Sequence, residues 1–124
     1  MKQIASDEEL VDVLVGHNSI LDAVMTHLSI YEEHDQLTVC MEFAMRPKSD
    51  FEKIRLKMLG VSEYGFYYKD DTVFYNVERF KFFVTREGGF YLSLDPIDDS
   101  DNVSDEDQDF VFGKHVVAFD VAPD

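Results

Sequence analysis

The chain has 124 residues, of which 45% are hydrophobic, and this combination is typical of a single domain, residues 1–124, with one core. It carries 26 acidic residues against 11 basic ones, a formal net charge of −15 at pH 7. That charge argues against binding to nucleic acid or to an anionic membrane, and it favours a basic partner. No segment approaches the ~20 apolar residues of a membrane-spanning helix.

The first predicted element is a helix from Ser6 to Gly16. Ser6 and Glu9 have the spacing of a capping box, in which two side chains satisfy free backbone N–H groups of the first turn. Leu10 and Leu14 recur at helical spacing and therefore share a face. We expect this face to pack against a sheet.

Residues 19–33 have two interpretations, because their apolar side chains recur at helical spacing but also alternate as in a strand. The next run, residues 37–45, alternates cleanly between apolar and other side chains. We therefore favour a strand in both places, joined by a hairpin turn at EEHDQ, residues 32–36.

The single cysteine, Cys40, lies in the second of these strands and excludes an internal disulfide. Its neighbours offer no basic or helix N-terminal setting that would activate a thiol, so we expect it to pack in or near the core. An unpaired cysteine in a chain that begins with MKQIASDEEL, which lacks the apolar stretch of a secretion signal, is typical of the reducing cytoplasm.

A third strand is predicted in FEKIRLKML, residues 51–59, because apolar and basic side chains alternate there and must face opposite ways. We interpret the basic side as a solvated sheet face. The alternative pairs it with the acidic segment described below, within the molecule or across a homodimer. The basic cluster consists of Arg46, Lys48, Lys53, Arg55 and Lys57.

Residues 64–91 hold most of the aromatic side chains, and turn sequences divide them at KDD, residues 69–71, and at REGG, residues 86–89. The pieces between the turns predict the short strands YGFYY, TVFYNV, RFKFFV and FYLSL. A last strand is predicted in FVFGKHVVAFDV, residues 110–121, with Gly113 as a bulge position. The fold class is therefore α+β: one short N-terminal helix followed by a mostly antiparallel, meandering β-sheet.

The segment DPIDDSDNVSDEDQD, residues 95–109 and here named the acid loop, connects the last two predicted strands. At about fifteen residues it is longer than most connections, and loops of that length tend to be functional or flexible. Its clustered carboxylates favour contact with a basic protein partner. The candidate partner-binding residues are Asp95, Asp98, Asp99, Asp101, Asp105, Glu106, Asp107 and Asp109.

Metal binding is an alternative use of the same acids, but the calcium pattern of an EF-hand fails. Counted from Asp105, the sixth position is Phe110 instead of Gly and the twelfth is Val116 instead of Glu. The histidines lack the spacing of a metal motif, and the chain carries no GxSxG, P-loop or GxGxxG sequence. We therefore predict no cofactor and no catalytic residue.

Three segments between His17 and Val116, namely HNSILDAV, RFKFFVTREGGFYLSLDP and DEDQDFVFGKHV, carry a resemblance. The chain resembles small uncharacterised bacterial proteins grouped as immunity proteins of polymorphic toxin systems. The resemblance implies a cytoplasmic protein that neutralises a cognate toxin by stoichiometric binding, with no chemistry of its own.

The leading hypothesis is thus a non-enzymatic acidic binding protein whose acid loop occludes a basic site on its partner. One alternative is a divalent-metal-binding module or metal-dependent enzyme that uses the Asp-rich loop. Another is a homo-oligomeric structural protein closed by exposed aromatic side chains, and the sequence leaves the oligomeric state open.

Overall fold

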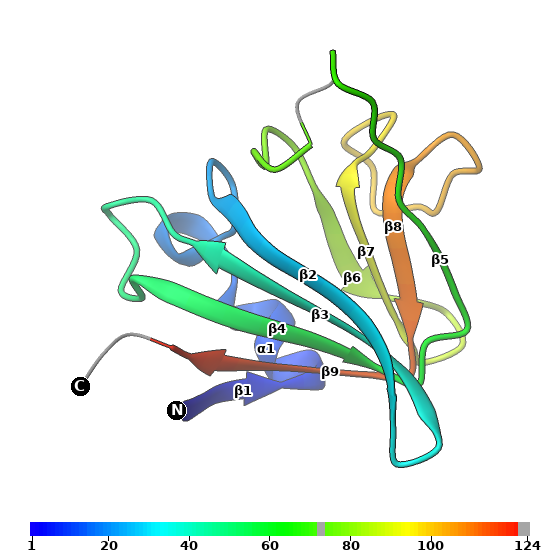
Figure 1. Cartoon of the computed structure of the whole chain (residues 1–124), viewed down its shortest axis with the longest axis horizontal. Helices are drawn as coiled ribbons and strands as arrows, with labels where there is room; N and C mark the ends of the chain where they lie inside the picture. Colours follow the sequence, from blue (N-terminus) through cyan, green and yellow to red (C-terminus); the bar gives the residue numbers. More distant parts are fainter. Residues whose placement is uncertain (72–73, 122–124) are drawn as a thin grey trace.

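A computed structural model describes residues 1–71 and 74–121, and these residues form one short α-helix and two antiparallel sheets (Figure 1). The predicted α+β class is confirmed, although the strands divide between two sheets instead of forming one. In the described residues, sheet A has the strand order β1-β9-β4-β3-β2 and sheet B the order β5-β8-β7-β6. The elements are β1 (Lys2–Ser6), α1 (Asp7–Val13), a 3-10 turn η1 (Gly16–Asn18), β2 (Val24–Glu33), β3 (Gln36–Ala44), β4 (Lys53–Leu59), β5 (Glu63–Gly65), β6 (Lys81–Val84), β7 (Phe90–Asp95), β8 (Gln108–Gly113) and β9 (His115–Asp120).

The hairpin of β2 and β3 confirms the strand interpretation from Val24 onward, whereas residues 19–23 precede β2 and form no strand. Its turn residues, His34 and Asp35, have φ values of 54° and 62°. Two successive left-handed residues match the right-handed twist of the flanking strands, which is why such turns are common in two-residue hairpins. Cys40 is buried, as predicted.

Strand β4 shows the predicted alternation, because Ile54, Leu56 and Met58 are fully buried and the basic side chains face outward. The outward cations Arg55 and Lys57 pair with acids of β3 and β2 instead of the acid loop. Arg55 Nη2 lies 2.7 Å from the Glu42 carboxylate, and Lys57 Nζ lies 3.0 Å from Glu33. The suggested pairing of this face with the acid loop within the molecule is therefore wrong for these two residues, because closer acids on β2 and β3 occupy them.

The N-terminal region differs from the prediction in two ways. Residues 2–6 form the strand β1 on β9, and the helix is shorter, running from Asp7 only to Val13 instead of to Gly16. The capping box is wrong: within the described structure the Ser6 side chain makes no cap hydrogen bond. Ser6 is extended as the last residue of β1, and Asp7 turns at φ 51° so that its carboxylate accepts from the Val116 N–H at 3.0 Å.

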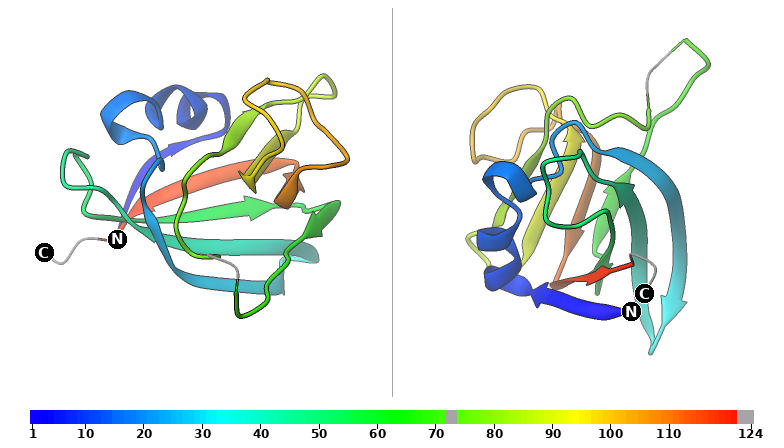
Figure 2. Two further views of the ribbon diagram at one scale, coloured as in Figure 1. Left: turned by 90° about the horizontal axis from the view of Figure 1, so that it is seen from above. Right: turned by 90° about the vertical axis from the view of Figure 1, so that its left-hand side faces the viewer.

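Helix α1 contacts β1 and β9 of sheet A and β6 of sheet B, and Figure 2 shows it on one side of the molecule. Its Leu10 is fully buried, so the predicted packing of the helix against a sheet is confirmed. No helix in residues 1–71 and 74–121 is long and apolar enough to cross a membrane.

The aromatic segment is only partly organised as predicted. RFKFFV and FYLSL supply β6 and β7, and the REGG turn joins them with Gly88 at φ 87°. YGFYY contributes no strand beyond Gly65. In TVFYNV, Thr72 and Val73 lie outside the described residues, and the rest is not a strand, although the Val77 N–H donates to Ala23 O at 2.9 Å.

The last predicted strand is two strands in different sheets, because β8 ends at Gly113 and β9 begins at His115. A Cβ at Gly113 would lie 3.2 Å from the carbonyl oxygen of Leu59, so the chain bends there against the end of β4. The core lies between the two sheets and includes Phe43 and Leu56 of sheet A and Leu92 and Val111 of sheet B.

Candidate functional site

The acid loop connects β7 to β8, and the structure describes all of its residues. It separates the predicted site residues into two groups. Two of them, Asp107 and Asp109, are buried with 4% and 8% of their surface exposed. The other six are exposed: Asp95, Asp98, Asp99, Asp101, Asp105 and Glu106.

Asp107 anchors the loop to the sheet and to itself. Its carboxylate accepts the Tyr91 hydroxyl at 2.6 Å, and it also accepts the backbone N–H groups of Ile97 at 2.9 Å and Ser104 at 3.1 Å. These contacts join Ile97 near the beginning of the loop and Ser104 in its second half to Tyr91 of β7. Buried charges persist only when they are paired and hydrogen-bonded, and this carboxylate is both.

Its cationic partner is Lys81 of β6, which is 3% exposed. Lys81 Nζ lies 3.1 Å from Asp107, 2.9 Å from Asp98 and 2.7 Å from the carbonyl oxygen of Asn102. Three acceptors use the three donors of the ammonium group. The loop is thus folded around one buried lysine.

The pKa values of this network follow from its contacts. Burial by itself would raise the pKa of Asp107, but the hydrogen bonds it accepts outweigh burial and hold the pKa below its usual value. For Lys81, burial would lower the pKa, whereas hydrogen bonds to Asp98 and Asp107 raise it above its usual value. The hydrogen bond from Lys81 is the main reason why the pKa of Asp98 falls to about 2. The network is therefore ionised at neutral pH.

Asp109 has a different environment. Its backbone is left-handed, with φ 51°, and its carboxylate accepts the Tyr67 N–H at 2.9 Å. Burial raises the pKa of Asp109 above its usual value, the Tyr67 N–H partly offsets this, and the nearby Asp95 adds to it. The negative charge is therefore unfavourable in the folded protein.

Replacing Asp109 with asparagine is expected to raise the free energy of unfolding at pH 7 by about 0.5–1 kcal/mol. Asparagine tolerates the left-handed backbone and keeps an oxygen for the Tyr67 N–H, but it removes the buried charge. Because the pKa of Asp109 is raised in the folded protein, its buried charge lowers the free energy of unfolding above that pKa. This loss of stability disappears as the pH falls through the pKa and the carboxylate is protonated. Urea unfolding at pH 7 and at pH 3 measures both effects, and an equal gain at the two pH values would contradict the charge argument.

The outer face of sheet B carries aromatic rings that the sequence analysis did not assign to a site. Val111 points into the core, so its neighbours Phe110 and Phe112 point outward, where they meet Tyr91 and Phe83. The Tyr91 ring centroid lies 4.7 Å from that of Phe112 and 5.3 Å from that of Phe83. We name these four residues the aromatic face. The alternation around Val111 in FVF is the pattern that could have indicated it.

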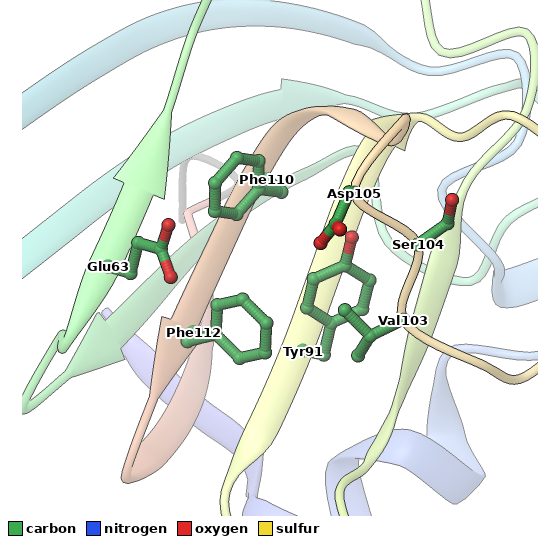
Figure 3. Close-up of a pocket in the computed structure, with 7 residues that line it drawn as sticks. All are labelled: Glu63, Tyr91, Val103, Ser104, Asp105, Phe110 and Phe112. Carbon is green, nitrogen blue, oxygen red and sulfur yellow. The ribbon is translucent and has the colours of Figure 1, made fainter.

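A pocket of about 260 Å³ opens on the aromatic face, and Figure 3 shows its lining. The rings of Tyr91, Phe110 and Phe112 form the floor. Glu63 of β5 and Asp105 of the acid loop stand at its two sides. A second hollow of about 410 Å³ shares Phe112 and extends to Asp101, Asn102 and Val103 of the loop as well as to the β6–β7 turn.

Among residues 1–71 and 74–121 no group of three or more His, Cys, Asp or Glu side chains is placed to hold a metal ion. Two exposed histidines pair with carboxylates, His17 with Asp50 at 3.2 Å and His115 with Asp7 at 3.3 Å. Both carboxylates also bind neighbouring groups, Asp50 the Asn18 amide and Asp7 the Val116 N–H. These pairs join segments distant in sequence.

Comparison with known proteins assigns no family to this site. No family model matches the chain, and no curated protein and no solved structure matches it either.

Proposed function

We propose that this chain is a non-enzymatic binding protein for a basic protein partner, and that the partner contacts the aromatic face together with the exposed residues of the acid loop. One observation carries the proposal: three half-buried rings, Phe83, Phe110 and Phe112, surround the buried Tyr91 on a sheet face that is bordered by carboxylates. Aromatic side chains are enriched at the centres of protein interfaces, where the rim is polar.

The rigidity of the loop supports the proposal. Lys81 and Asp107 hold the loop at several backbone positions, so the exposed carboxylates are presented in one arrangement. A loop that is already ordered loses less conformational entropy when a partner binds. Clustered carboxylates also steer a basic partner during its approach and raise the association rate at low ionic strength.

Neutralisation of a cognate toxin in the cytoplasm is the concrete form of this proposal. Small size, strong acidity and the resemblance in segments 17–24, 79–96 and 105–116 support it. A toxin that acts on nucleic acid needs a basic groove, and carboxylates of the acid loop could take the place of phosphates in that groove. Binding would then block the groove by occlusion.

The test uses the protein encoded by the gene next to this one, with association followed by surface plasmon resonance at low salt. Changing four exposed acids of the loop to their amides is expected to slow association at least tenfold. Asp98 and Asp107 stay unchanged because they hold Lys81. The four changes are Asp99→Asn, Asp101→Asn, Asp105→Asn and Glu106→Gln.

The matched control removes the same charge elsewhere on the surface. It changes four exposed acids outside the loop: Glu8→Gln, Glu9→Gln, Asp12→Asn and Glu52→Gln. An equal loss in the two variants would show that only net charge matters and would reject the loop as the site. No binding by the unchanged protein would reject neutralisation of that neighbour.

A further inference from the structure

We infer that the 260 Å³ pocket on the aromatic face binds one cationic side chain of the partner, an arginine. The inference rests on the proposed function, since it names the group that the partner inserts. It goes further in assigning a pocket, a ligand chemistry and the residues that select it.

The floor of the pocket consists of aromatic rings. The centroid of Phe112 lies 4.7 Å from that of Tyr91 and 5.8 Å from that of Phe110, so the three rings contact one another; Phe110 and Phe112 are half-buried, whereas Tyr91 is buried. Figure 3 shows the rings of Phe110 and Phe112 between Glu63 and Asp105, with the Tyr91 ring next to Asp105 and Val103. Ring faces carry negative partial charge and attract a cation within about 6 Å, and arginine makes this contact more often than lysine.

The sides of the pocket add two full negative charges. Glu63 is paired with Phe112 across β5 and β8, and Asp105 belongs to the acid loop on the other side of the floor (Figure 3). Both residues are exposed. A carboxylate beside an aromatic floor disfavours anions and gives a neutral ligand no charge to pair with. The planar guanidinium group of arginine can stack on a ring while it donates hydrogen bonds at its edge.

The size of the pocket fits a single side chain better than a drug-sized ligand. Its 260 Å³ lies below the range of about 300–1,000 Å³ that is typical of pockets for drug-sized ligands. An arginine presented by a partner needs only the guanidinium group and its aliphatic stem to enter. The rest of the partner would lie over the neighbouring hollow, which shares Phe112.

The walls are held in place before any ligand binds. The Tyr91 hydroxyl donates to Asp107 at 2.6 Å, which fixes the ring that forms part of the floor. Ser104, next to Asp105, donates its N–H to Asp107 and accepts the Asp107 N–H at 3.1 Å. The network around Asp107 therefore positions both the floor and one wall, and it limits the entropy lost on binding.

The experiment titrates the whole protein with three small probes and follows the aromatic ring signals by NMR. The probes are N-acetyl-arginine methylamide, the corresponding lysine derivative and the corresponding citrulline derivative, which is neutral and nearly the same shape as arginine. Arginine is expected to shift the signals of Tyr91, Phe110 and Phe112 and to bind at least tenfold more tightly than citrulline. Lysine should bind at the same rings but more weakly. Equal binding of arginine and citrulline would overturn the inference.

A pair of variants locates the binding site. The double variant Glu63→Gln with Asp105→Asn should weaken arginine binding at least tenfold, because both wall charges are lost. Glu106→Gln is the control and is compared with the single variant Asp105→Asn, since each removes one charge and Glu106 is exposed and adjacent in sequence but does not line the pocket. An equal effect of Glu106→Gln would indicate attraction to the acid loop as a whole and would overturn the assignment. If the arginine probe fails to bind but the four loop changes still slow association with the protein partner, the pocket is rejected and the proposed function stands. If the arginine probe binds but the four loop changes leave association with the protein partner unchanged, only the proposed function is rejected.

Discussion

Replacing Lys81 with methionine is expected to lower the free energy of unfolding by about 3–5 kcal/mol, because the carboxylate of Asp107 then stays buried without its cation. Methionine retains most of the length of the lysine stem, so the loss reports the charge more than the packing. Urea unfolding at pH 7 measures it. Hydrogen exchange gives a second measurement, since release of the acid loop should speed exchange of the Ile97 and Ser104 N–H groups.

The control is Arg79→Met, which removes another cation paired with the acid loop. Arg79 Nε lies 3.6 Å from Asp99, and the two side chains are 49% and 92% exposed. Exposed pairs contribute little, so this change should cost less than about 1 kcal/mol. If Lys81→Met prevents folding, adding Asp107→Asn should restore part of the stability by removing the unpaired charge. A cost for Lys81→Met no larger than that of the control would show that the buried pair does not hold the loop.

Replacing Leu56 with alanine is expected to lower the free energy of unfolding by about 2–5 kcal/mol. Leu56 is fully buried in the middle of β4, between Met41 of β3 and Ala118 of β9 in the register of sheet A. The loss combines the transfer free energy of the deleted atoms with the cavity that close-packed neighbours cannot fill. Thermal and urea unfolding should agree on its size.

Lys53→Ala is the matched control on the same strand. Lys53 faces outward with 40% of its side chain exposed and lies 3.4 Å from Glu42, so its loss should cost less than about 1 kcal/mol. The contrast tests the alternation of β4 directly. Similar costs for the two substitutions would mean that the inner face of sheet A is not packed as the structure shows.

Strands with a clear alternation were predictable from the sequence, and β4 is the best example. Its buried side chains Ile54, Leu56 and Met58 lie on one face and its three basic side chains on the other, so a period of two leaves a single assignment of faces. The two strands on either side of Lys114 show the limit of predicting strands from the pattern of apolar residues. Apolar residues stand on both sides of Gly113, Lys114 and His115, so the pattern predicts one strand with a bulge and contains nothing that assigns its halves to different sheets.

Elements that depend on distant partners were not predictable. Strand β1 is five residues long and pairs with residues near the other end of the chain. Its sequence, KQIAS, has little strand character of its own. The expected cap at Ser6 failed for the same reason, because pairing with Val117 holds Ser6 in the sheet and Asp7 binds β9 instead.

The position of the acid loop between two strands was predictable, but its internal arrangement was not. Lysine is rarely fully buried, so nothing in RFKFFV indicated that the acid loop would bury Lys81 by binding it through Asn102 and Asp107. Charge counting treats all eight acids alike, whereas the fold separates buried from exposed carboxylates. Contact of the six exposed ones with a partner stays a prediction.

The pairing of β1 with β9 has a consequence for the kinetics of folding. Lys2 lies opposite Asp120, so the edge of sheet A closes a loop of more than a hundred residues. Closing so long a loop costs conformational entropy before its contacts form, and chains dominated by such pairings fold in milliseconds to seconds. On the ribosome, β2, β3 and β4 can pair early, but sheet A is completed only after residues 115–120 have emerged. Until then β4 has an unpaired edge open to misassembly with other chains.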